Sequence, residues 1–180
     1  EKFFNIAGPC IPGEHYMLPA LQRNPEIKSL IDQKQYFVIH AAGRPVKPLV
    51  EKPGEPFEPG GGLLCALLFA RVSLGITDPK EGMLQIISNL KKALYFEKVE
   101  AKENLKGIDN TEYTTSIYLS LAKLSEELGK PFVLLFDEAD CLSNGTLITF
   151  LRQLRDGYVN RGNIPFVHSI ALVGMRDIRD

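Results

Sequence analysis

Two adjacent carboxylates, Asp137 and Glu138, directly follow a fully apolar run at residues 132–136. Five consecutive apolar residues predict a strand that is buried on both faces. In an open parallel sheet, ligands bind beyond the carboxyl ends of the strands. A carboxylate there can hold Mg²⁺, and an adjacent glutamate can orient or deprotonate a water molecule. The pattern therefore predicts a catalytic centre at Asp137 and Glu138. The alternative is that the pair only ends the strand and begins the next helix.

A glycine-rich loop is expected after the first predicted strand, Tyr36–His40, because the backbone N–H groups of such a loop cradle phosphates. Lys47 lies where the loop lysine would reach the terminal phosphates. Val46, however, stands where glycine permits close backbone approach, and Pro48 stands where a hydroxyl would bind the metal. The sequence predicts a damaged phosphate loop with Lys47 as its remnant. The alternative is that Lys47 is an ordinary loop lysine.

Apolar strand patterns alternate with helical patterns along the chain, which is typical of a parallel sheet with helices on both faces. Asp78 and Pro79 predict the start of one helix, and Gly129 predicts the end of the next. Residues 43–62 are predicted to be irregular, because ten of these twenty are Pro or Gly. We expect a three-layer α/β fold. Its strands are predicted at residues 36–40, 63–70, 132–136 and 167–173, with further helices at 25–33 and 147–154.

The composition describes one ordinary domain of 180 residues with a net charge of −1, which gives no global basic surface for nucleic acid. Three widely spaced cysteines favour a reducing compartment, so we expect a cytoplasmic protein. The longest apolar run, residues 63–70, is too short for a membrane span. Because the chain starts at Glu1 and stops at Asp180, directly after a predicted strand, we expect a fragment of a domain whose C-terminal part is missing. The oligomeric state stays open.

Several segments taken together resemble bacterial AAA-like ATP-binding proteins, a class of P-loop NTPases. The 136–140 segment resembles the Walker B motif of that family, and residues 1–24 contain segments that resemble its opening region. Together the segments are more specific than any one of them. The matching segments are residues 3–10, 15–19, 31–41, 136–140, 151–155 and 172–177.

The resemblance implies a three-layer P-loop NTPase domain that binds ATP and Mg²⁺ and hydrolyses ATP. In that scheme Asp137 holds the metal and Glu138 activates water. Arg176, just past the last predicted strand, senses the γ-phosphate, and Arg23 and Tyr16 lie beside the base. The family further implies action on DNA or on a protein partner through a C-terminal region.

The phosphate loop is where the chain departs from that family, which has a run such as Arg-Gln-Ala-Gly-Lys-Thr-Thr there. Codons for residues 43–49 can be chosen so that a shift in reading frame yields that run. We therefore hypothesise that about residues 43–73 are a frameshifted stretch, which the DNA sequence would test. As written, the chain is expected to bind ATP weakly and hydrolyse little of it.

Two other functions are open. Residues 137–140 also spell the Asp-Glu-Ala-Asp signature of RNA helicases, although the Ser-Ala-Thr element and the Gly-Lys-Thr loop of helicases are absent from the sequence. A nucleic-acid helicase core would show turnover stimulated by RNA or DNA. A non-catalytic interaction scaffold with the same fold would bind partners regardless of Glu138.

Overall fold

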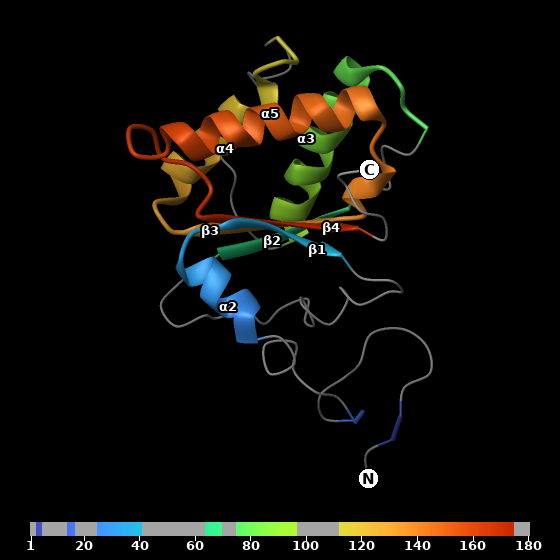
Figure 1. Ribbon diagram of the computed structural model, residues 1–180, viewed down its shortest axis with the longest axis vertical. Coiled ribbons are helices and arrows are strands. Elements are labelled where there is room, and N and C mark those ends of the chain that lie inside the picture. Colours follow the sequence, from blue (N-terminus) through green and yellow to red (C-terminus); the bar gives the residue numbers. More distant parts are fainter. Residues whose placement is uncertain are drawn as a thin grey trace.

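The computed structural model describes residues 3–4, 14–16, 25–40, 64–69, 75–96 and 112–174. These residues form three layers, with a central sheet, helix α2 on one face and helices α3, α4 and α5 on the other (Figure 1). The predicted irregular region at 43–62 and most of the opening segment lie outside the described residues. None of the described helices has the length and apolar character needed to cross a lipid bilayer.

The sheet has four strands in the order β1-β4-β3-β2, and every neighbouring pair is parallel. This confirms the predicted parallel α/β sheet, and all four predicted strands are present. Strand β4 is inserted between β1 and β3, so the order differs from the Rossmann and flavodoxin-like orders. The strands are β1 (Tyr36–His40), β2 (Leu64–Phe69), β3 (Phe132–Asp137) and β4 (Ser169–Gly174).

The helices are close to the predicted positions. Asp78 caps α3, since the backbone N–H of Lys80 donates to its Oδ1 at 3.1 Å, and Gly129 ends α4 in the left-handed conformation with φ 56°. The helices are α2 (Pro25–Asp32), α3 (Pro79–Phe96), α4 (Ser116–Leu128) and α5 (Asn144–Asn160), with a short 3₁₀ helix, η4 (Ala139–Cys141), after β3.

Helix α5 is longer at both ends than the predicted 147–154. Glycine has low helix propensity, so Gly145 and Gly157 make the two ends of α5 difficult to predict from the sequence. Tertiary packing overrides that preference: the ring of Phe166 packs directly against Gly157, where a Cβ would overlap it. The helix is thus extended by a contact that local propensity does not reveal.

Strand β3 is buried on both faces and divides the core into two clusters. Phe132, Leu134 and Phe136 pack with α3, α4 and α5, whereas Val133 and Leu135 belong to the cluster beneath α2. The alternation follows from the period of two along a strand. It explains why the run at 132–136 is apolar throughout.

Gln153, a buried residue of α5, contacts both of the other helices on this face, α4 through hydrogen bonds and α3 through Met83. The Oε1 atom of Gln153 accepts the N–H groups of Ile117 and Tyr118 at 2.8 and 3.2 Å, and its Nε2 donates to the carbonyl of Tyr113 at 3.0 Å. Gln153 therefore satisfies the first N–H groups of α4, which have no partner within their own helix. This fixes α4 against α5 above the sheet.

Candidate functional site

The carboxyl rim, where the four parallel strands end, holds the predicted carboxylates. Phe136 of β3 is in register with Leu172 of β4, which is in register with Val38 of β1. Asp137 is therefore one residue short of the level of His40, where β1 ends. Adjacent strands lie ~4.8 Å apart, so β3 and β1, with β4 between them, are roughly 10 Å apart. Asp137 thus lies on the rim from which the chain leaves β1.

Asp137 is the last residue of β3 and is half-buried. By the alternation along the strand, its side chain continues the row of Val133 and Leu135 on the α2 side. Its Oδ1 accepts the backbone N–H of Glu138 at 2.8 Å. That bond fixes the direction in which the chain turns out of the sheet.

Glu138 has left-handed backbone angles, φ 57° and ψ 36°, immediately before η4. A non-glycine residue in this region costs about 1–2 kcal/mol. Lys34, with φ 58°, also lies in this region, but there the cause is a Schellman motif at the end of α2: Lys34 N–H donates to Ile31 and Gln35 N–H to Leu30. No helix end precedes Glu138. Strain of this kind is often found at functional sites, and it places Glu138 directly beside the strand exit.

A third carboxylate, Asp140, reaches the same rim. A Cβ added to Gly174, the last residue of β4, would lie 3.0 Å from Asp140 Oδ1. The side chain of Asp140 thus packs against the backbone where β4 ends, between Asp137 and the exit of β1. Asp140 was not among the predicted site residues. The available signal was its spacing of three from Asp137, which is one turn of a 3₁₀ helix.

The donor set suits a metal that needs few protein ligands. Among the described residues, no group of three or more His, Cys, Asp or Glu side chains could enclose a metal ion. Mg²⁺ is commonly held by one or two carboxylates together with water and phosphate oxygens. Asp137 at the rim fits that requirement.

Of the four remaining predicted site residues, the structure describes only Tyr16. Lys47, Arg23 and Arg176 lie outside the described residues, and Gly174 ends β4 two positions before Arg176. Tyr16 is described and 54% exposed, and its ring packs on that of Phe4 with centroids 5.0 Å apart. The isolated bridge between Phe3 and His15, next to this pair, lies beyond α2, away from the sheet (Figure 1).

The opposite rim, where the strands begin, is here called the amino rim, and it contains two groups with shifted pKa. Burial raises the pKa of Tyr36, partly offset by the nearby Arg161, and the Tyr36 hydroxyl donates to the carbonyl of Val167 at 3.0 Å. Burial lowers the pKa of His168, whose Nε2 donates to the carbonyl of Ile31 at 3.1 Å. Each side chain donates a hydrogen bond to a backbone carbonyl of a segment distant in sequence. The pKa shifts of Tyr36 and His168 therefore reflect burial in the fold.

No protein-family model, curated protein or solved structure matches this chain.

Proposed function

We propose that the chain is an ATP-binding and ATP-hydrolysing domain of the AAA-like P-loop NTPase class, with nucleotide binding impaired by the residues in its phosphate loop. One observation carries the proposal. Asp137 and Glu138 leave a buried central strand on the same rim as the exit of β1, roughly two strand spacings away. A loop that follows β1 would therefore meet these carboxylates at the edge where open α/β sheets bind ligands.

The chemistry assigned to the rim needs two different carboxylates. Asp137 would hold Mg²⁺ directly or through water, and the bound ion would compensate charge on the β- and γ-phosphates. Glu138 would orient an attacking water and accept its proton. The left-handed backbone of Glu138 supports a functional role for this residue, because strain of this kind is often found at functional sites.

Further roles belong to residues outside the described ranges and to Tyr16. The family resemblance assigns the terminal phosphates to Lys47, the γ-phosphate charge to Arg176, and the base to Arg23 and Tyr16. Arg176 follows β4, whose end lies between those of β1 and β3, so its position in the chain agrees with that role. ATP hydrolysis would drive action on DNA or on a protein partner.

The proposed impairment of nucleotide binding follows from the chemistry of the side chains in the predicted phosphate loop. Pro48 has neither the hydroxyl that would bind the metal nor an N–H for a phosphate oxygen. Val46 brings a branched side chain to a position where backbone must approach phosphate closely. Lys47 alone supplies a point charge, which is insufficient for tight binding in the absence of the N–H cradle.

The test compares the native chain with a repaired chain in which residues 43–49 become Arg-Gln-Ala-Gly-Lys-Thr-Thr. Titration with labelled ATP and Mg²⁺ should show weak binding by the native chain and micromolar binding by the repaired one. A Lys47→Ala change in the repaired chain should abolish the gain. A repaired chain that binds ATP no better than the native chain would contradict the proposal.

Measurement of ATP hydrolysis distinguishes a catalytic domain from a non-catalytic scaffold. In the repaired chain, Glu138→Gln should leave ATP binding intact and reduce turnover by at least about 100-fold, within the range for loss of a general base. Glu126→Gln, on the exposed face of α4, is the matched control and should leave turnover unchanged. Equal turnover in the two variants would remove Glu138 from the mechanism.

A further inference from the structure

Gly174 ends β4 and does not need glycine for its backbone conformation. The described glycines with a positive φ are Gly75 and Gly129, and Gly174 is not among them. Glycine within a strand often marks a place where another group approaches closely. A Cβ on Gly174 would lie 3.0 Å from Oδ1, 3.2 Å from Cγ and 3.3 Å from Cβ of Asp140. Space for the Asp140 side chain therefore accounts for the glycine at this position.

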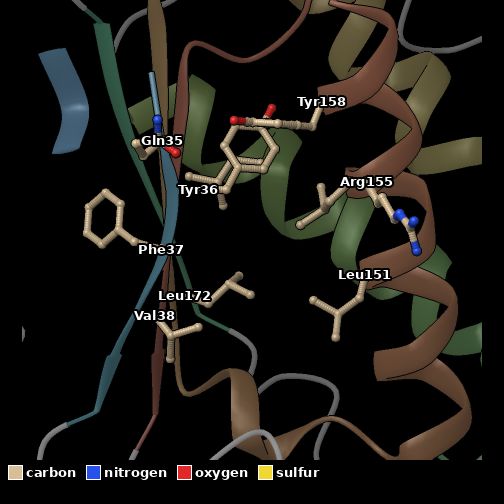
Figure 2. A pocket seen from close by; sticks show the side chains of 10 residues that line it. Gln35, Tyr36, Phe37, Val38, Leu151, Arg155, Tyr158 and Leu172 are labelled. Atoms are coloured by element: carbon tan, nitrogen blue, oxygen red, sulfur yellow. The ribbon is translucent and has the colours of Figure 1, made fainter. Parts of the chain in front are cut away.

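Asp140 approaches β4 from the face of the sheet that α5 covers. Figure 2 shows Leu172 of β4 on that face, opposite Leu151 of α5. Because side chains alternate along a strand, a Cβ on Gly174, two residues later, would point to the same face. Asp137 instead continues the row of β3 side chains on the α2 face. The two aspartates thus lie on opposite faces of the sheet at the carboxyl rim.

Glu138 lies where the chain crosses from one face to the other. Its N–H donates to Asp137 Oδ1 at 2.8 Å, and its carbonyl accepts the N–H of Cys141 at 2.9 Å. The next residue, Ala139, is fully buried in the core. A left-handed non-glycine residue persists only where the surrounding structure fixes it. The contact of Asp140 with Gly174 adds support from a neighbouring strand, so it helps to fix the backbone of Glu138.

We propose that Asp140 is a positioning residue, which holds the turn at Glu138 against the end of β4 and so fixes the direction of the Glu138 carboxylate. In the proposed function, on which this inference rests, Glu138 activates water for attack on ATP. Asp140 lies on the opposite face from Asp137, and the described residues contain no group of three or more ligating side chains that could enclose a metal ion. Asp140 therefore acts through the backbone of Glu138 and not on Mg²⁺.

The experiment measures kcat, KM and ATP affinity in the repaired chain. Asp140→Ala removes the carboxylate that packs on Gly174, so the turn can relax. The kcat should fall roughly 10- to 100-fold, the range for a misplaced catalytic group, while KM and ATP affinity stay unchanged. Asp140→Asn keeps the shape of the side chain and should restore most of the turnover. Asp156→Ala, at an exposed aspartate of α5, is the matched control and should leave kcat unchanged.

Two double variants test whether Asp140 acts through Glu138 and through Gly174. Adding Asp140→Ala to Glu138→Gln should reduce turnover no further, because the group that Asp140 positions is already lost. Gly174→Ala places a Cβ against the Asp140 carboxylate and should also lower kcat. Adding Asp140→Ala then makes room for this Cβ, so the two losses should not multiply. Losses that multiply in either double variant would overturn the proposal.

The same measurements distinguish failure of this role from failure of the proposed function. A repaired chain without ATP turnover would remove both. A repaired chain that hydrolyses ATP, with kcat unchanged in Asp140→Ala or equally reduced in Asp140→Asn, would leave the ATPase and overturn the positioning role. Urea denaturation gives the folded fraction of each variant under the assay conditions. A loss of kcat that follows the unfolded fraction would also overturn it, since Asp140 would then only stabilise the fold.

Discussion

At the amino rim, polar side chains are used to tie backbone segments together, whereas at the carboxyl rim carboxylates gather around a strained turn. Three side chains between the end of α5 and the start of β4 donate to carbonyls in the last turn of α2 or just after it. They are Arg161 to Lys34 at 2.6 Å, His168 to Ile31 at 3.1 Å, and Ser169 to Gln35 at 2.6 Å. At the carboxyl rim, Asp137 bonds to the N–H of the next residue, and Asp140 packs on the end of β4.

Under the proposed function, this difference separates residues that stabilise the fold from residues that carry activity. Bonds between segments distant in sequence stabilise the fold, so substitutions at the amino rim should mainly change the free energy of unfolding. A non-glycine residue with a left-handed backbone lowers stability, and such strain is often found at functional sites. Substitutions there should change activity while leaving the fold intact.

The largest effect is expected at Gly157, which supports the segment entering the amino rim. In Gly157→Ala the new Cβ would overlap the ring of Phe166, and the displaced packing should lower the free energy of unfolding by about 2–3 kcal/mol. Urea denaturation measures this. Gly162→Ala is the control, because an added Cβ there meets no atom within 4 Å, and its effect should stay within about 0.5 kcal/mol. Equal losses of stability in the two variants would show that the contact between Gly157 and Phe166 does not stabilise the fold.

The next effect concerns a single bond across the amino rim. Ser169 is buried, and its hydroxyl donates to the carbonyl of Gln35. Ser169→Ala should lower the free energy of unfolding by about 1–2 kcal/mol, because a carbonyl is left without its partner. Ser29→Ala, which removes an exposed bond to Gln33, should be nearly neutral. An unchanged free energy of unfolding in Ser169→Ala would show that the bond from Ser169 to Gln35 does not stabilise the amino rim.

The two described non-glycine residues with a left-handed backbone, Lys34 and Glu138, test the comparison directly, since one lies at each rim. Glycine adopts this backbone without strain, so Lys34→Gly and Glu138→Gly should each raise the free energy of unfolding by up to about 1 kcal/mol. In the repaired chain only Glu138→Gly should reduce ATP hydrolysis. Loss of turnover in both variants, or in neither, would contradict the separation of the two rims.

The smallest effect is a pH dependence at His168. Burial lowers its folded pKa below the ordinary value of 6.5; Lys34 and Arg161 act in the same direction, and the bond to Ile31 and the charge of Asp32 oppose them. Because the folded state disfavours the protonated ring, the contribution to stability is present above pH 6.5 and is lost as pH falls through the folded pKa. His168 is not fully buried, so the change should be small.

The pH effect is isolated by His168→Gln, whose amide can still donate a hydrogen bond to the carbonyl of Ile31. Unfolding free energies of the native chain and this variant, measured between pH 5 and 8, should converge as pH falls below about 6.5. Curves that stay parallel over this range would show that His168 is not the titrating group.

Much of the fold could be predicted from local patterns. The apolar run at 132–136 predicts a buried strand whatever its neighbours are, and this strand contributes side chains to both core clusters. The caps at Asp78 and Gly129 were predictable because they act within a few residues. The ends of α5 were not, since the packing of Phe166 on Gly157 depends on residues nine positions apart in a fold not yet formed.

For the candidate site, the sequence determined which groups are available: a carboxylate pair after a hydrophobic strand, and Val46, Lys47 and Pro48 in the predicted phosphate loop. Only the tertiary structure decided that β4 separates β3 from β1, that Glu138 is strained, and that Asp140 returns to the rim. The reason is physical. Side-chain chemistry and strand period are local properties of the chain, whereas strand order and the meeting of Asp140 with Gly174 depend on how distant segments pack.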